Sequence, residues 1–492
     1  MRKPTLLLFL IPFSTIVLCH SVQARLNTIT GGITTSYDYD NPKYDGEGNA
    51  GETLSGQDDL TQQLSIGPLF IFETTSSTDG FSVSYNPSFV YDLEDSQSDV
   101  DHNLTLTAYR DFTRRLRIEL NENFIYSDDP QLIEDEISSD FNRGRRRYWT
   151  NDANINSTYT YDTGSNIGVG YSYEILRNDD TGPGGYEDYD RHIADISLQH
   201  RINNAWNFLL FTSYTRGLFD PPDPIRVDRA ETILEEISPG MTANVNADEL
   251  SNDLSEYSLG GTVNWIYSSR KTFFLSYDFS ATNYDAILRY NTNLHNLTLG
   301  AQYQYTRHLS FDIGAGPSYE KTETFDPNWG YNGHFNLTYN IAEHTSFSAG
   351  VETGYDQENF SANDNALNRD QGLTEFWNFN ADLSHEITND LIGTVFASYR
   401  DENQENILNG FVNALETEGN IASIDRETFR DESTFSRKTY EAGGSLAYTF
   451  LQWYTASLRY TFRTQDSEVA NDSYDEHRIY LTLSFQKELF RW

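Results

Sequence analysis

Arginine alternates with apolar residues near the C-terminal end of the sequence. Leu458, Tyr460 and Phe462 occupy every second position, so the intervening Arg459 and Arg463 share the opposite face of one extended segment. A guanidinium group keeps its charge and binds carboxylates and other oxyanions through two parallel hydrogen bonds. Arginines at this spacing can therefore form ion pairs within a wall, or orient anionic and polar solutes that pass along it.

The flanking segments follow the same parity and enlarge this polar face. The candidate residues are then Arg437, Glu441, Arg459, Arg463 and Arg478. If the face lines a pore, a basic wall of this kind favours anions and tunes charge selectivity. Alternatively, the arginines pair with inward acids such as Glu441 and Asp38, which makes their burial tolerable. The sequence leaves both interpretations open.

Alternation with a period of two extends over nearly the whole chain and indicates strands. Segments such as Phe273-Leu275-Tyr277-Phe279 show apolar residues on one face and mostly Ser, Thr, Asn, Asp or Gly on the other. We count about 20 strands, with a range of 18–22. They are expected to begin near Ile33, Leu60, Phe81, Asn103, Leu116, Trp149, Asn166, His192, Ala205, Tyr257, Thr272, Asn296, Leu309, Gly333, Thr345, Trp377, Leu391, Thr439, Tyr454 and Arg478.

The connections between these segments alternate in length. Short ones include 76–80, 162–165 and 203–204. The long ones are 40–59, 92–101, 127–147, 177–189, 220–254, 285–294, 320–331, 356–373, 401–436 and 464–476. Short turns on one rim and long loops on the other are typical of an antiparallel up-and-down transmembrane β-barrel, with periplasmic turns and external loops. A soluble sandwich is the alternative, but aromatic residues bracket single strands at the spacing of an apolar band.

Composition agrees with a barrel. The 492 residues carry a net charge of −40 and are 37% hydrophobic, yet 14% are aromatic, which is unusual for a disordered chain. A helical membrane protein would need apolar runs of about 20 residues throughout. An acidic chain without a basic face also disfavours nucleic acid as a partner. A barrel strand needs only one apolar face, so low hydrophobicity is compatible with a membrane protein.

Residues 1–24 have the pattern of a secretory signal peptide. Arg2 and Lys3 precede an apolar run, and Val22-Gln23-Ala24 resembles a cleavage site. Cleavage there would leave residues 25–492 as the barrel and would remove Cys19, the one cysteine. Disulfides, thiol catalysis and cysteine metal sites are then excluded. Export of this kind predicts location in the cell outer membrane.

The chain ends in Leu489-Phe490-Arg491-Trp492 after an alternating segment. With the strand pattern, this ending resembles bacterial outer-membrane β-barrels, and more loosely the putative β-barrel porins encoded beside exopolysaccharide genes. The resemblance covers the whole mature chain but includes no diagnostic internal motif, and the final strand lacks the glycine that assembly signals often contain. It implies a pore-forming or export role and assigns no residue a function.

The remaining chemistry of the sequence is sparse. Acidic residues in the long loops could hold Ca²⁺ or Mg²⁺ and bridge to lipopolysaccharide, but the spacing of a dedicated calcium loop is missing and a solvated surface explains them equally well, as at Asp128, Asp129, Glu134, Asp135 and Glu136. The basic run Arg143, Arg145, Arg146 and Arg147 could attract an anionic polysaccharide or bind lipid phosphates, but it is rather expected to offset the acids of its own loop, residues 127–140. His102, His192 and His477 have acidic neighbours, but no nucleophile elbow or zinc motif accompanies them.

These observations predict an outer-membrane porin-like channel that lets polar solutes or an exported polysaccharide diffuse passively. No enzyme activity and no cofactor are expected, and the metal content is left undefined. Expected partners are outer-membrane lipid and lipopolysaccharide, with divalent cations at acidic loops; the oligomeric state is open. An adhesin or structural barrel that acts through its acidic external loops is the alternative function.

Overall fold

Twenty antiparallel strands form one closed sheet in the computed structural model, as the sequence predicted. The structure describes residues 25–44, 60–94, 96–128, 147–179, 188–219, 253–285, 291–323, 327–356, 373–405, 434–468 and 473–492. The first ten strands are β1 (Leu26–Tyr44), β2 (Thr61–Thr75), β3 (Asp79–Asp92), β4 (Ser98–Asp111), β5 (Leu116–Ser127), β6 (Tyr148–Asp162), β7 (Ser165–Asn178), β8 (Tyr189–Arg201), β9 (Trp206–Phe219) and β10 (Leu254–Ser268). The second ten are β11 (Lys271–Tyr284), β12 (Thr292–Gln304), β13 (Leu309–Thr322), β14 (Asn328–Ala342), β15 (Thr345–Asp356), β16 (Thr374–Thr388), β17 (Leu391–Glu405), β18 (Thr434–Phe450), β19 (Tyr454–Ser467) and β20 (Tyr474–Arg491).

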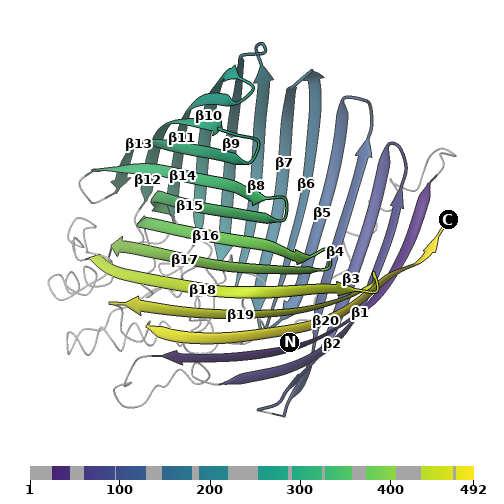
Figure 1. The fold of residues 1–492 in the computed structure, drawn as a ribbon. Coiled ribbons are helices and arrows are strands. Elements are labelled where there is room, and N and C mark those ends of the chain that lie inside the picture. The colour runs from purple at the N-terminus through teal and green to yellow at the C-terminus, as the bar shows by residue number, and fades with distance from the viewer. Residues whose placement is uncertain are drawn as a thin grey trace.

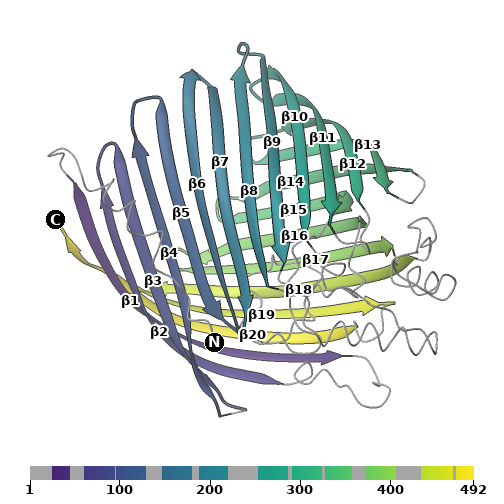
Figure 2. The same ribbon diagram turned by 180° about the vertical axis from the view of Figure 1, so that it is seen from behind.

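Each strand pairs with its neighbours in the chain, and β1 pairs with β20 to close the barrel (Figures 1 and 2). The closing register runs from Thr28 opposite Arg491 to Tyr44 opposite Tyr474, with one irregularity between Ile29 and Thr30. Closure satisfies the backbone hydrogen bonds of both edge strands, which is a requirement for any sheet that lies in lipid. Within the described ranges, no helix is long and apolar enough to cross a bilayer.

One rim of the barrel, which we call the turn rim, carries the short connections 76–78, 112–115, 163–164, 202–205, 269–270, 305–308, 343–344, 389–390 and 451–453. Local chemistry specifies these turns. Gly164 has a φ of 77°, a conformation that strains residues with a side chain. At the next turn, the Asn203 Oδ1 atom accepts hydrogen bonds from the backbone N–H groups of Ala205 (2.8 Å) and Trp206 (3.0 Å). We call the opposite edge the loop rim.

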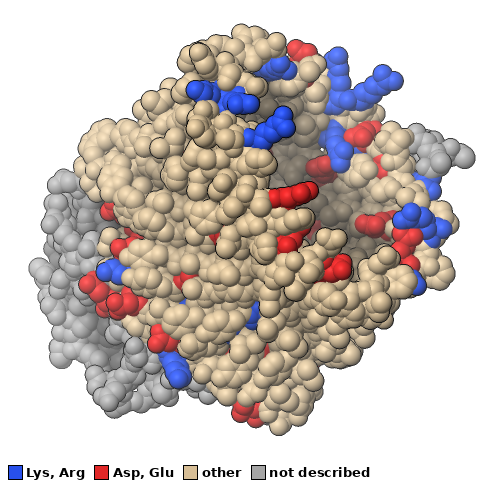
Figure 3. Space-filling view, viewed as in Figure 1, with Lys and Arg blue, Asp and Glu red and all other residues tan. Residues whose placement is uncertain are grey.

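The outer face of the wall is apolar. Leu299, Val395 and Val169 are 66%, 62% and 52% exposed, as expected for side chains that face lipid. Figure 3 shows the outer wall almost free of charge, whereas charged side chains gather at the rims and in a hollow. Glu122 is an exception, since its register partners Leu106 and Ala153 belong to the outer face.

The inner face is polar and forms hydrogen bonds between strands. Asn121 Nδ2 donates to Asn154 Oδ1 (3.1 Å), and Asn264 Nδ2 donates to Asn207 Oδ1 (2.8 Å). Thr105 donates to an asparagine of β5 in the same way. Amide and hydroxyl groups can exchange these bonds for bonds to water, so this wall is suited to a hydrated interior.

Candidate functional site

A row of ion pairs crosses the inner wall from β17 through β18, β19 and β20 to β1, in the half nearer the loop rim. We call it the charge ladder and define it as Asp38, Arg400, Glu402, Arg437, Glu441, Arg463, Glu476 and Arg478. Its members lie on adjacent strands at inward positions, because the outward positions of these strands are taken by residues such as Tyr440, Tyr460 and Ile479. Four of the five candidate positions therefore share one row: Arg437, Glu441, Arg463 and Arg478.

Two pairs of the charge ladder are each joined by two hydrogen bonds, and in the second pair the bonds go to different oxygens of the carboxylate. Arg463 donates from Nε (3.0 Å) and Nη2 (2.5 Å) to Glu441 Oε2, and Arg478 donates from Nε to Asp38 Oδ1 (2.9 Å) and from Nη2 to Asp38 Oδ2 (2.7 Å). All four residues are 5–8% exposed. At that burial a charge is tolerable only when it is paired, so these pairs form a mutually neutralising unit.

The remaining part of the ladder lies on β17 and β18. Arg437 Nη1 is 3.6 Å from Glu402 Oε2, and Arg400 forms an ion pair with the same carboxylate. Arg463 lies between two glutamates in the register, with Glu441 opposite it on β18 and Glu476 opposite it on β20. Glu402 and Glu476 are not among the predicted site residues, because they fall in the predicted loops 401–436 and 464–476. In the structure β17 continues to Glu405 and β20 begins at Tyr474. Continuing the inward–outward alternation of these two strands by a few residues places both glutamates on the inner face.

Arg459 lies on the same inner wall but outside the ladder. Its Cζ atom is 5.0 Å from the centroid of the Phe396 ring, and the side chain is exposed. Of the four candidate arginines, Arg437, Arg463 and Arg478 are buried, and Arg459 is the one that is exposed. The structure thus brings Arg437, Glu441, Arg463 and Arg478 together and leaves Arg459 four residues nearer the turn rim.

Carboxylates occupy inward positions on other strands of the barrel. Asp278 accepts a hydrogen bond from Ser276 (3.0 Å), and Asp312 accepts one from Gln302 (3.1 Å) and lies 3.2 Å from His334 Nε2. Asp382 is partly exposed at an inward position of β16, opposite Phe396 of β17. In contrast to the charge ladder, these acids have no arginine opposite them in the register, so they contribute negative charge to the interior.

Other sequence predictions fall only partly on described residues. Arg143, Arg145 and Arg146 lie outside them, as do the acids 129–136 and most of the other long loops, so a divalent-cation site there stays a prediction. Arg147 is described, and its ion-pair partners among the described residues are Asp99 and, at 2.8 Å, Asp101 of β4. Pairing of the basic run with the acids of its own loop stays a prediction. In the described ranges no group of three His, Cys, Asp or Glu side chains could hold a metal ion.

The histidines considered for catalysis do not form catalytic pairs with the acids beside them in the chain. His102 and His477 are on the outer face, whereas the neighbouring Asp101 and Glu476 are on the inner face. The wall of the barrel separates each imidazole from that carboxylate. His192 also faces outward, where its Nδ1 atom is 2.8 Å from the hydroxyl of Tyr171.

The described strands form a closed antiparallel sheet with an apolar outer face and a polar, charged inner face. This is the architecture of an outer-membrane β-barrel. Each strand displays lipid-compatible side chains on one side only, and the backbone is hydrogen-bonded around the whole circumference. The fold class predicted from the sequence is confirmed, including the strand number.

Solved structures of other proteins resemble this chain over most of its length. OpdQ of Pseudomonas aeruginosa is 12% identical, with a TM-score of 0.40 over 94% of this chain and 98% of that chain. OccAB3 of Acinetobacter baumannii is 9% identical, with a TM-score of 0.43 over 93% and 99%, and the siderophore receptor PirA of the same organism is 9% identical, with a TM-score of 0.48 over 94% and 81%. No family model and no curated protein matches the sequence.

The turn rim contains a titratable contact that can be tested directly. His344 Nδ1 is 2.8 Å from Glu386 Oε2, and this hydrogen bond raises the pKa of His344 above its ordinary value of 6.5. A raised pKa in the folded state means that the contact stabilises the barrel below the unfolded-state pKa and loses that effect as the pH rises through the folded-state pKa. We expect Glu386→Gln to lower the titration midpoint of His344 in an NMR experiment on the refolded protein.

Glu343→Gln is the matched control, because Glu343 acts on His344 only as a smaller, through-space charge. It should lower the midpoint less than Glu386→Gln does. An unchanged midpoint in Glu386→Gln would show that the contact is absent in solution.

Proposed function

We propose that the barrel is a passive, water-filled channel for polar solutes across the outer membrane, with the turn rim on the periplasmic side. The observation that carries this proposal is the contrast between the two faces of one closed wall: hydrogen-bonding amides, hydroxyls and carboxylates inside, and exposed aliphatic and aromatic side chains outside. Residues 1–24, which lie outside the described part of the chain, would act as a cleaved export signal.

Within this proposal, the two kinds of inner-wall charge have different roles. The charge ladder is a neutral structural element, because its buried arginines are held by carboxylates. The inward carboxylates Asp278, Asp312 and Asp382 have no arginine opposite them in the register, and of the four candidate arginines Arg459 alone is exposed, so the interior favours cationic or neutral polar solutes over anions. Of the arginines expected to tune charge selectivity, Arg459 is the one to which this proposal still gives that role.

The proposal predicts discrete conductance steps when the purified, refolded protein is added to a planar lipid bilayer. A transmembrane pore filled with water conducts ions without any energy source, and each inserted molecule adds one step of the same size. Adding sugars of increasing size to the bath should reduce the step, and the size at which the reduction ceases measures the width of the pore.

Folding must be monitored in the same preparation by heat-modifiable electrophoretic mobility, which distinguishes a folded barrel from an aggregate. A folded barrel that produces no steps would contradict the channel and would favour the alternative of an adhesin or structural barrel. Partial block by an anionic or neutral polysaccharide, but not by monosaccharides, would support an exported polysaccharide as the solute.

A further inference from the structure

Of the five hydrogen-bonded Tyr–His pairs on the outer face of the described strands, four share one pattern. In each of these four pairs a Tyr hydroxyl contacts the Nδ1 atom of a His on the next strand, at 2.8–2.9 Å. The pairs are Tyr85–His102, Tyr171–His192, Tyr277–His295 and Tyr460–His477. They lie on β3–β4, β7–β8, β11–β12 and β19–β20, so successive pairs are four strands apart except across β15–β16.

The four pairs lie at one height. Each tyrosine is six residues after the first residue of its strand, and each histidine is opposite the residue two positions further on, namely Pro87, Tyr173, Phe279 and Phe462. Eight residues at about 3.3 Å each and a tilt of about 40° place the histidines about 20 Å above the turn-rim ends of the strands. An apolar band is about 25 Å tall, so the pairs mark its limit on the loop-rim side. On β15–β16, Val351 and Trp377 take the two positions.

The imidazoles keep one polar atom available. A tyrosine hydroxyl that donates to Nδ1 fixes the neutral ring as the tautomer with its proton on Nε2. In the part of the chain that the structure describes, the Nε2 atom of none of the four rings has a hydrogen-bond partner. Aromatic contacts hold the rings in place, with centroid distances of 4.8 Å from Tyr173 to His192, from Phe279 to His295 and from Phe462 to His477.

Basic side chains stand beside each pair on its loop-rim side. Arg216 is opposite His192 in the register, and the Arg147 guanidinium lies 5.0 Å from the ring centroid of Tyr126, the register partner of His102. Lys321 is opposite Asn293, two residues before His295, and Lys43 is opposite Asp475, two residues before His477. Arg216 and Arg147 also bind the carboxylates of Asp285 and Asp101, whereas Lys43 and Lys321 are exposed.

We propose that these Tyr–His pairs form a ring of binding sites for the phosphate groups of lipids in the leaflet at the loop rim. Each site offers an Nε2–H donor on the outer face, with a cation at headgroup height, while the tyrosine and second aromatic ring contact the start of the acyl chains. A phosphate is the acceptor that matches this set, because it is anionic, accepts several hydrogen bonds and lies at the boundary of the apolar band.

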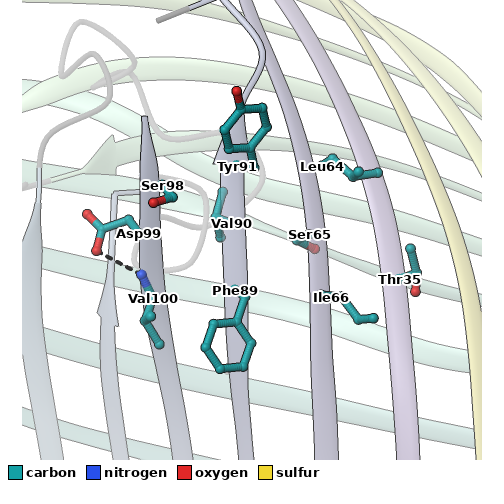
Figure 4. Close-up of a pocket in the computed structure, with 10 residues that line it drawn as sticks. All are labelled: Thr35, Leu64, Ser65, Ile66, Phe89, Val90, Tyr91, Ser98, Asp99 and Val100. Carbon is teal, nitrogen blue, oxygen red and sulfur yellow. Dashed lines mark hydrogen bonds between the residues drawn. The ribbon is translucent and has the colours of Figure 1, made fainter. Parts of the chain in front are cut away.

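The site at His102 adjoins an apolar cavity, which favours a lipid over a soluble phosphate. The cavity has a volume of about 460 Å³ and lies on the outer face across β1–β4 (Figure 4). Phe89 and Val100, which are register partners two residues along from Pro87 and His102, line it together with Leu64 and Ile66. A hydrocarbon chain fits such a lining, and the free phosphate ion does not use it.

The inference rests on the proposed function, which places the barrel in the outer membrane. The following test distinguishes failure of the inference from failure of the proposed function. Wild-type protein and the variant His102→Phe/His192→Phe/His295→Phe/His477→Phe are refolded with bisphosphorylated lipid A in mixed micelles. Retained lipid is then counted by native mass spectrometry. Phenylalanine keeps the ring contacts and removes the donor, so we expect retention to be about tenfold weaker. A parallel series with dephosphorylated lipid A, which has the same acyl chains, should show no difference between the two proteins.

His200→Phe is the matched control. The Tyr161 hydroxyl also contacts the Nδ1 atom of a histidine, His200, at 2.7 Å, but this pair joins β6 to β8 and lies at the turn rim. This variant should retain lipid A as the wild type does. Equal loss in His200→Phe, or wild-type retention in the fourfold variant, would overturn the proposal, as would displacement of the lipid by inorganic phosphate alone at equal concentration.

Should the fourfold variant fail to fold, a fourfold Tyr→Phe variant at positions 85, 171, 277 and 460 serves the same purpose. It leaves the histidines in place but removes the hydroxyl that fixes their tautomer, so retention should again fall, and unchanged retention would contradict the ring. Conductance in a bilayer should stay at the wild-type value in either variant. A barrel that conducts normally but retains phosphorylated and dephosphorylated lipid A equally would contradict the proposed lipid sites and would leave the proposed channel function unaffected.

Discussion

Replacing Asp38 with Asn should destabilise the folded barrel by about 3–5 kcal/mol, the cost of leaving one partner of a buried ion pair uncompensated. Asp38 accepts two hydrogen bonds from Arg478, at 2.9 and 2.7 Å, and both residues are less than 10% exposed. The pair joins β1 to β20, where the two ends of the sheet meet. Equilibrium unfolding of the refolded protein in urea, followed by tryptophan fluorescence, measures the loss.

A double variant separates burial of a charge from loss of a contact. Asp38→Leu/Arg478→Met removes both charges and keeps similar volumes, so its stability should return to within about 1–2 kcal/mol of the wild type. Arg463→Gln provides a matched lesion away from the closing strands, because Glu441 lies on β18 and Arg463 on β19. It should lower stability to a similar extent.

We expect the ion pair between β1 and β20, which closes the barrel, to affect the rate of refolding as well as stability. The two strands are separated by almost the entire chain, so their pairing closes a long loop of chain. Asp38→Asn should therefore slow refolding, whereas Arg463→Gln, whose strands are joined by the short connection 451–453, should mainly accelerate unfolding. Equal stability of wild type and Asp38→Asn would show that this pair contributes nothing to closure.

The sequence identified every strand, and the accuracy of each boundary depended on the rim. The strands that begin at short turns within the chain were located to within two residues, for example Leu116, Leu309 and Tyr454, each at the residue expected. Turn residues act locally, so their chemistry is visible in the sequence. Nine of the ten strands that begin at the loop rim were placed one to five residues late, as at Asn103 for Ser98 and Gly333 for Asn328, and β2 was placed one residue early. There the strands rise above the apolar band, where alternation no longer carries information.

The same boundary effect limited the candidate site. Parity alone assigned Arg437, Glu441, Arg459, Arg463 and Arg478 to one face, because it is a property of single strands. The pairing between side chains is not a property of single strands. Whether Arg478 pairs with Asp38, or Arg437 with Glu402, depends on the register between strands and on closure of the sheet. Sequence reasoning therefore gave the direction of each side chain but not which of them neutralise one another.

Selectivity of the pore for cations is the other large effect that we expect. Asp278, Asp312 and Asp382 are inward carboxylates without an arginine opposite them, whereas three of the four candidate arginines are buried in the charge ladder. A carboxylate about 7 Å from the path of an ion in water changes its energy by about 0.6 kcal/mol, which is a factor of about three in permeability. The reversal potential across a KCl gradient should thus indicate a preference for potassium over chloride.

Charge-neutral replacements test the assignment in both directions. Asp278→Asn/Asp312→Asn/Asp382→Asn should reduce the ratio of potassium to chloride permeability by about threefold or more, and Arg459→Gln should raise it by a similar factor. Both effects should weaken at 1 M salt, because the screening length falls to about 3 Å. The buried Arg463 provides the control for Arg459. The double variant Arg463→Gln/Glu441→Gln removes one positive and one negative charge, so the ratio of potassium to chloride permeability should not change. A pore that prefers chloride in the wild type would reject this assignment and restore the charge ladder as the element that selects solutes.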